Sequence, residues 1–134
     1  MTDIHSNITI PTTKVKESSL TQLDLANIKF GHAFTDHMFI VDYDNGEWIN
    51  PQIRPFGPIQ MHPATSSIHY GQSIFEGMKA HRNNEGEIVF FRMNDHAARF
   101  CYSAKRMAMP EIPKGLFRKG IMELVKLDQA WVPQ

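Results

Sequence analysis

Arg99 is the residue whose place in the sequence points most directly to chemistry. It falls in the second turn of a helix predicted to start near Asn94, where a cation gains nothing from the positive end of the helix macrodipole. A nearby anion would explain it, because an arginine fork near a helix N-terminus is a common way to hold a phosphate. An ordinary ion pair with Asp95 or Glu111 is the simpler explanation. The residues alone leave both interpretations open.

Lysines and histidines could support Schiff-base formation and metal binding. Lys79 stands out among the lysines because it lies in a strand-like stretch with aromatic neighbours. Lysine is seldom buried, so a solvated strand lysine is the preferred interpretation. The pairs His32/His37 and His62/His69 lack the i, i+4 helical spacing and the clustered partners that make a metal site specific. We therefore expect no metal site.

Other known catalytic layouts are missing from the sequence. It contains no Gly-rich phosphate loop, no HExxH, no CxxC and no nucleophile elbow. Its many phenylalanines and methionines could line an apolar pocket, but at strand or helix spacing such residues more often form a core. Spacing alone does not name a function.

Two hairpins and two helices are predicted to position these residues. The first hairpin joins a strand at 37–43 to residues 47–49 through Asp44-Asn45-Gly46, and the second joins 75–82 to 87–92 through the loop 83–86. Between the hairpins, the prolines should interrupt any long strand or helix: Pro51, Pro55, Pro58 and Pro63.

After Arg92 the apolar period changes to that of a helix. The residues on one face are Ala97, Phe100, Cys101, Ala104, Met107 and Ala108. We expect Asn94 to cap this helix and Pro110 to stop it. A second helix should start near Pro113 or Lys114 and end before Pro133. Together these elements predict an α+β fold, a mostly antiparallel sheet from two hairpins with the C-terminal helices packed on it.

Composition narrows the range of partners. The 134 residues contain 14 Lys plus Arg and 14 Asp plus Glu, so no net charge favours nucleic acid or an anionic membrane. The single cysteine, Cys101, and an N-terminus without a signal-like apolar stretch suggest a cytoplasmic setting. We expect residues 1–25 to be a partly flexible lead-in and residues 26–134 to form one domain.

Four stretches of the sequence resemble branched-chain aminotransferases, which are pyridoxal-phosphate enzymes of fold type IV. These stretches are 30–38, 62–64, 69–80 and 91–110, and the resemblance extends over about residues 28 to 134. The pattern Tyr-Gly-x-x-x-Phe-Glu-Gly at 70–77 also resembles D-amino acid aminotransferases and aminodeoxychorismate lyases. Phe-Thr-Asp-His-Met at 34–38 and Phe-Glu-Gly-Met-Lys-Ala at 75–80 are more specific to the branched-chain enzymes.

The resemblance implies roles for five residues. Arg99 would bind the phosphate of pyridoxal 5′-phosphate, and Phe30, Tyr70 and Phe75 would form the wall that receives the branched side chain, with Gly77 leaving room beside them. An apolar pocket discriminates one methylene by only about 1 to 3 kcal/mol, so overlapping activity on Leu, Ile and Val is expected. The intact enzyme, expected to be a homodimer, would exchange the amino group with 2-oxoglutarate and glutamate.

The family's cofactor-binding lysine has no counterpart among the lysines here, so no catalytic residue is assigned. That lysine is expected in a second domain outside this chain, and the chain alone is expected to be inactive. Two rival hypotheses are a D-amino acid aminotransferase or aminodeoxychorismate lyase of the same fold type, and a non-catalytic module that binds a small ligand or a subunit.

Overall fold

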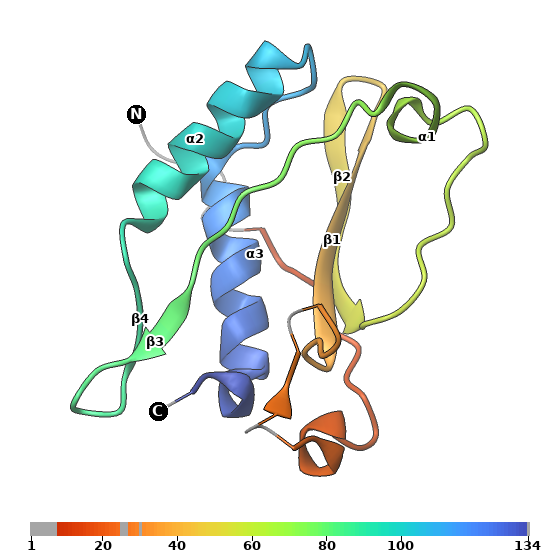
Figure 1. The fold of residues 1–134 in the computed structure, drawn as a ribbon. Coiled ribbons are helices and arrows are strands. Elements are labelled where there is room, and N and C mark those ends of the chain that lie inside the picture. Colours follow the sequence, from red (N-terminus) through yellow and green to blue (C-terminus); the bar gives the residue numbers. More distant parts are fainter. Residues whose placement is uncertain (1–7, 25–26, 30, 134) are drawn as a thin grey trace.

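The fold is α+β, as the sequence predicts, with two antiparallel hairpins followed by two long helices (Figure 1). The computed structural model describes residues 8–24, 27–29 and 31–133. Its elements are η2 (Ser19–Gln22), β1 (His37–Asp44), β2 (Glu47–Pro55), α1 (Ser66–Tyr70), β3 (Ala80–Arg82), β4 (Ile88–Phe90), α2 (Met93–Arg106), α3 (Lys114–Leu127) and η4 (Gln129–Trp131). The two hairpins form separate two-stranded sheets.

The first hairpin turns at the predicted residues. Asn45 and Gly46 have φ angles of 48° and 90°, which suit a tight two-residue turn between right-twisted strands. The expectation that Pro51 interrupts any long strand is wrong, because β2 continues to Pro55. The pairing register shifts between Ile40 and Asp42, opposite Asn50 and Pro51. A proline at such a bulge removes no ladder hydrogen bond, so the strand tolerates it.

The second hairpin is shorter than predicted. Only Ala80–Arg82 and Ile88–Phe90 pair, because Arg92 adopts a left-handed φ of 53° and turns the chain out of the sheet. Residues 75–79 therefore have no strand opposite them. From residue 71 to residue 80 the odd-numbered residues are nevertheless exposed and the even-numbered ones half-buried, which is the alternation of an extended chain. This extended segment, 71–79, has one outward and one inward face.

The two long helices are where the sequence places them, but their ends differ. The expected cap at Asn94 is wrong: the N-cap is Arg92, α2 starts at Met93, and the Asn94 side chain accepts a hydrogen bond from Arg118 instead. The helix also ends before Pro110, after Arg106. There the Met109 amide donates to the Ala104 carbonyl at 2.8 Å, across Ala108 in the left-handed region. The predicted start of α3 beside Pro113 is confirmed.

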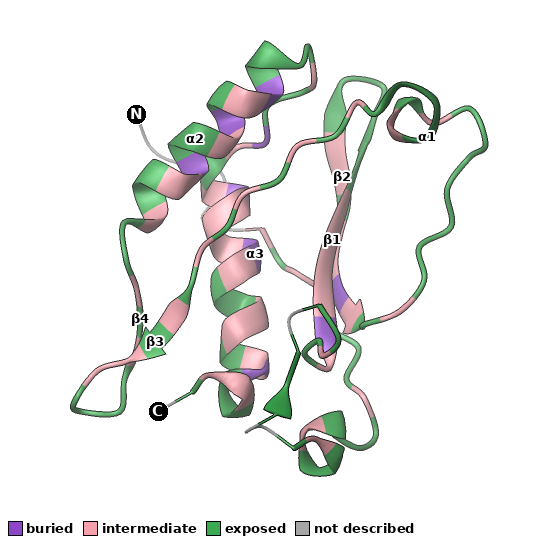
Figure 2. Cartoon of the chain, viewed as in Figure 1, coloured by how far each residue is buried: buried purple, intermediate pink, exposed green. Residues whose placement is uncertain are grey.

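The core lies between α2, α3 and the first hairpin, with α3 in the middle (Figures 1 and 2). Its buried apolar residues are Ile53, Ala97, Cys101, Ala104, Ile112 and Leu116. Gly120 on α3 is buried where the Phe39 ring of β1 packs, and a Cβ atom there would collide with the ring. The close approach of hairpin and helix therefore depends on glycine at this position. Among the described helices, none is long and apolar enough to cross a membrane.

A buried histidine joins three distant parts of the chain. His37, at the start of β1, donates from Nδ1 to Asp128 at 2.6 Å, just after α3. Its Nε2 accepts from the backbone amide of Val15 at 3.0 Å. An imidazole that accepts at one nitrogen and donates at the other is neutral. His37 is thus a structural core histidine, which is the interpretation that the sequence favoured over a metal ligand.

Asp36 adds a second tie between the same three parts. Its carboxylate accepts from Ser18, from Ser19 and from Trp131, at distances between 2.6 and 3.0 Å. Although desolvation opposes it, these hydrogen bonds hold the pKa of Asp36 well below its usual range. Residues 8–24 therefore contact the rest of the fold, and the division of the chain at residue 26 stays a prediction.

Candidate functional site

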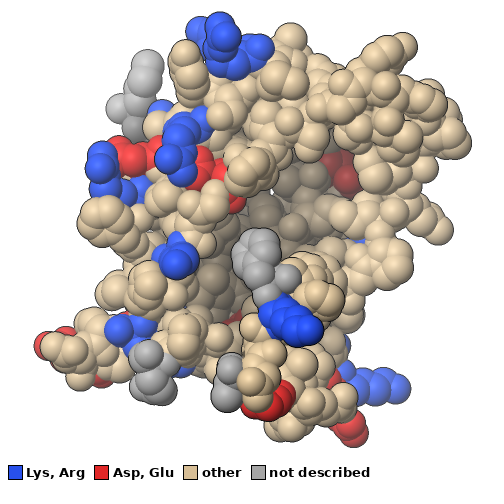
Figure 3. Space-filling view, viewed as in Figure 1, with Lys and Arg blue, Asp and Glu red and all other residues tan. Residues whose placement is uncertain are grey.

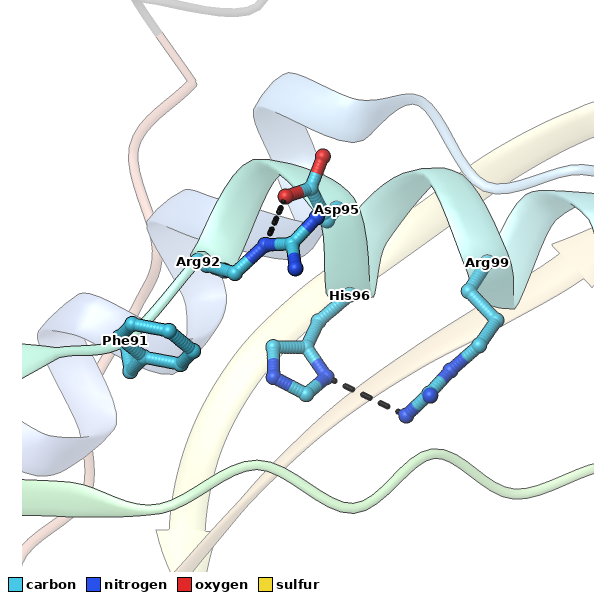
Figure 4. Close-up of a pocket in the computed structure, with 5 residues that line it drawn as sticks. All are labelled: Phe91, Arg92, Asp95, His96 and Arg99. Atoms are coloured by element: carbon cyan, nitrogen blue, oxygen red, sulfur yellow. Dashed lines mark hydrogen bonds and ion pairs between the residues drawn. The ribbon is translucent and has the colours of Figure 1, made fainter.

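An open pocket of about 420 Å³ lies along the first two turns of α2 (Figure 4). Phe91 and Arg92 line it from the turn before the helix, and Asp95, His96 and Arg99 line it from the helix itself. Residues three or four apart share a helix face, which brings His96 and Arg99 side by side. Pockets that bind small ligands have volumes from roughly 300 to 1,000 Å³. The pocket is therefore large enough for a small anionic ligand.

Arg99 pairs with Glu76 from the extended segment. The guanidinium donates from Nε to one carboxylate oxygen at 2.7 Å and from Nη2 to the other, a two-bond fork. The expected alternatives, Asp95 or Glu111, are both wrong as ion-pair partners. Asp95 instead accepts from Arg92 at 2.6 Å, within the same turn. Hydrogen bonding to Glu76 raises the pKa of Arg99 further above its usual value.

The side chain of Glu76 is almost fully covered although it is acidic. Its side chain is 6% exposed, whereas that of Arg99 is 64% exposed. Besides Arg99, the carboxylate accepts from His96 Nδ1 at 3.0 Å and from the backbone amide of Gly77 at 3.0 Å. The hydrogen bonds from Arg99, opposed by desolvation and helped by the other donors, lower the pKa of Glu76 to about 2. The carboxylate is ionised at neutral pH.

Charges around α2 are balanced rather than concentrated. In the space-filling view, Lys and Arg side chains lie next to acidic ones over this helix (Figure 3). The two pairs that border the pocket, Arg92 with Asp95 and Arg99 with Glu76, account for part of this balance. An anion bound here would be recognised by local donors rather than by a broad positive field.

Three of the residues expected to bind substrate, Phe75, Gly77 and Tyr70, lie on or just before the extended segment. Phe75 and Gly77 are both on its outward face, and Phe75 is 91% exposed. Phe75 borders a second open hollow of about 340 Å³ together with Tyr102 and Met107. A Cβ atom at Gly77 would meet no atom within 4 Å, so the position borders open space.

Tyr70 lies at the end of α1 and is 85% exposed. Phe30 lies outside the described residues. Lys79, the lysine considered for Schiff-base chemistry, is exposed on the outward face of the extended segment. The structure therefore places Arg99 in one pocket and Phe75 at another.

Glu76 is the site residue that the sequence analysis missed. It stands 23 positions before Arg99, and no helical spacing connects the two. The apolar residues Ile74, Met78 and Ala80, at the same even positions, could have placed Glu76 on the inward face. Nothing in the spacing shows that this face meets α2.

Comparison with known proteins gives a consistent result. A branched-chain-amino-acid aminotransferase from Mycolicibacterium smegmatis is 44% identical over 131 residues, covering 97% of this chain and 34% of that protein. A protein of the same name from Mycobacterium tuberculosis is 45% identical over 105 residues, covering 78% and 28%. Branched-chain-amino-acid transaminase 1 of Bacillus subtilis is 39% identical over 112 residues, covering 83% and 32%. No protein-family model matches the chain.

The chain spans about a third of the length of these curated relatives. The identity nevertheless extends over nearly all of this chain in the first of them. The relatives carry the branched-chain name rather than that of a D-amino acid aminotransferase or an aminodeoxychorismate lyase, so that rival is not favoured. By its sequence, this chain belongs to the branched-chain aminotransferase family.

Proposed function

We propose that residues 26–134 form the N-terminal domain of an enzyme that transfers the amino group between Leu, Ile or Val and 2-oxoglutarate. The observation that carries this proposal is the 44% identity to a branched-chain aminotransferase over 97% of the chain. The intact enzyme would use pyridoxal 5′-phosphate. The lysine that holds the cofactor would come from a second domain, since the relatives are about three times as long as this chain.

The pocket on α2 fits the phosphate group of this cofactor. A guanidinium has five N–H donors, and Glu76 takes two of those of Arg99. The remaining donors lie at a pocket wall that also includes the Arg92 guanidinium and the Phe91 ring. Forked, charge-assisted donors suit a phosphate better than a point charge does. When bound, pyridoxal phosphate supplies an electron sink for reaction at the substrate's α-carbon.

The chain's own residues would bind and orient. Arg99 would hold the phosphate, so that the cofactor lies against α2. Phe75 and Gly77, with Tyr70 and Phe30, would form the apolar wall for the branched side chain and keep water from it. The extended segment places Phe75 outward while its neighbour Glu76 faces Arg99. One short stretch would thus serve both the substrate and the cofactor. We further propose that the intact enzyme is a homodimer in the cytoplasm.

Arg99→Ala in the full-length protein tests the cofactor role. Losing charge-assisted bonds worth about 1.5 to 3 kcal/mol should weaken pyridoxal phosphate binding roughly 10- to 100-fold. The measurement is a titration of cofactor into apoprotein, followed by absorbance. Because the variant also leaves the buried Glu76 without its main partner, apoprotein melting is recorded alongside.

Arg99→Lys is the matched control. It keeps a positive charge for Glu76 but lacks the fork, so it should spare apoprotein stability more than Arg99→Ala while still weakening cofactor binding. Wild-type cofactor affinity in both variants would remove Arg99 from the cofactor site. It would leave the ion pair with Glu76 as a purely structural contact.

A further inference from the structure

The Glu76 carboxylate is saturated with donors. It accepts from Nε and Nη2 of Arg99, from Nδ1 of His96 and from the Gly77 amide, while its side chain is 6% exposed. Burying a charge is unfavourable unless it is paired and hydrogen-bonded, and here each of those conditions is met. A long, flexible glutamate on the surface would not need this arrangement. The site is built around this carboxylate.

The backbone that carries Glu76 is held in place on α2. The Gln72 side chain donates to the Met107 carbonyl, at the end of α2, with a distance of 2.8 Å. The alternation along 71–80 then directs each even-numbered residue inward. Glu76 therefore reaches Arg99 from a fixed direction. The guanidinium, by contrast, ends a long side chain that is 64% exposed and would otherwise sample many rotamers.

Two bonds from one edge of a planar guanidinium fix its plane as well as its position. The same carboxylate oxygen that binds Nη2 of Arg99 also binds His96, so both pocket-lining side chains share one anchor. Nη2 lies 3.4 Å from His96 Nδ1 (Figure 4). We take His96 Nδ1 as the donor to Glu76, because that distance of 3.0 Å is shorter.

We propose that Glu76 is a positioning residue, which holds the guanidinium of Arg99 and the ring of His96 at the pocket wall so that their free edges face a bound phosphate. The inference rests on the proposed role of Arg99 as the phosphate ligand. Glu76 acts through Arg99 and touches neither substrate nor cofactor.

The charge of Glu76 also has an electrostatic effect on phosphate binding, which opposes the benefit of positioning Arg99. A carboxylate beside a phosphate site repels the dianion and neutralises the charge of Arg99. If Glu76 were only a counter-ion, removing its charge would tighten phosphate binding. If Glu76 positions Arg99, Glu76→Gln weakens binding, because the amide keeps one acceptor oxygen but replaces the other with an NH2 donor, which breaks the two-bond fork. The two accounts predict opposite signs for one substitution.

The test is Glu76→Gln in the full-length protein, measured by titrating pyridoxal phosphate into the apoprotein. We expect binding weaker by on the order of 10-fold, the lower range for loss of a charge-assisted constraint. Glu85→Gln, which removes an equal charge from the exposed loop of the second hairpin, should leave the affinity unchanged. Tighter or wild-type binding in Glu76→Gln would overturn the proposal. Should this variant not fold, Glu76→Asp is expected to shift affinity in the same direction by a smaller factor.

A double-mutant cycle separates the positioning role of Glu76 from the phosphate-binding role of Arg99. If Glu76 acts through Arg99, Glu76→Gln should change cofactor affinity by less than about 2-fold in an Arg99→Ala background. An undiminished loss there would show that Glu76 works by another route and would overturn the positioning role. Weak binding in Arg99→Ala with normal binding in Glu76→Gln would refute only the positioning role. Normal binding in Arg99→Ala would refute the proposed phosphate ligand itself.

Discussion

Phe75 and Glu76 are neighbours in the sequence and point in opposite directions. Phe75 is 91% exposed, although a phenylalanine gains about 1.5 to 3 kcal/mol from burial. Glu76, which burial alone would destabilise, is buried against α2. Both placements reverse the usual preference of their residue type. An exposed aromatic ring next to a built ionic site is typical of a ligand-binding surface.

Phe75→Ala in the full-length protein should lower kcat/KM for leucine more than for glutamate. The lost ring surface would contact the branched side chain, which accounts for about 1 to 3 kcal/mol of transition-state binding. Because the ring is exposed here, its removal leaves no cavity in the core of this domain. Steady-state kinetics with both amino acids check this prediction. Equal losses for the two substrates would reduce Phe75 to a structural role.

The sequence identified Arg99 but not its partner, for a physical reason. Arg99 could be singled out because its position conflicts with a local rule, the helix macrodipole. No local rule marks Glu76, since the burial of its side chain depends on contact with Arg99, which lies 23 positions later in the sequence. Contacts of this kind are set by tertiary structure. Local periodicity gives the face on which a side chain lies but not the element that it meets.

At the level of elements, the ends of α2 show where sequence rules are weakest. The helical period located the helix, and Asn45-Gly46 located the first turn, because both depend only on neighbouring residues. Asn94 had the right side chain for a cap but bonds to Arg118 on the other helix. Pro51 was expected to break a strand, yet the bulge in β2 accommodates it. In both cases a contact with another element, Arg118 of α3 for Asn94 and strand β1 for Pro51, decided the local structure.

Ala108→Gly should stabilise the protein. Ala108 has a φ of 51° and closes α2 in a left-handed C-terminal motif, where a Cβ atom is unfavourable and glycine is preferred. The gain should be about 0.5 to 1 kcal/mol after allowing for the greater unfolded-state freedom of glycine. Ala98→Gly, at an exposed position inside the same helix, should instead cost about 1 kcal/mol. Melting temperatures of the two variants should therefore move in opposite directions, and a loss in both would contradict the strain at Ala108.

For the molecule as a whole, one long stretch between the two hairpins lacks the side chains that carry a full charge at neutral pH. Residues 55–75 contain no Asp, Glu, Lys or Arg. Several large apolar side chains in this stretch are exposed: Phe56, Ile59, Met61, Ile68, Tyr70 and Phe75. In the space-filling view the region at α1 is tan, with one red patch in the hollow beside it (Figure 3). Surfaces of this composition are typical of protein interfaces, in agreement with the proposed homodimer and second domain.

The 134-residue chain alone should not transaminate. It supplies phosphate and side-chain contacts in the proposed scheme but not the lysine that holds the cofactor. The assay combines the purified chain with leucine, 2-oxoglutarate and added pyridoxal phosphate, and the full-length protein serves as the control. Borohydride trapping followed by peptide mapping should show adducts scattered over surface lysines. Turnover close to that of the full-length protein would refute the proposed division of labour between domains.

The ring of His37 cannot reach its final environment until the chain has been synthesised as far as Asp128. Its acceptor, Asp128, follows it by 91 residues. At ribosomal rates of about 5 to 20 residues per second, roughly 5 to 20 seconds separate the synthesis of the two. During that interval the β1–β2 hairpin has left the ribosome while the α3 surface that covers Phe39 does not yet exist. The newly made hairpin therefore keeps an uncovered apolar face until α3 has been synthesised.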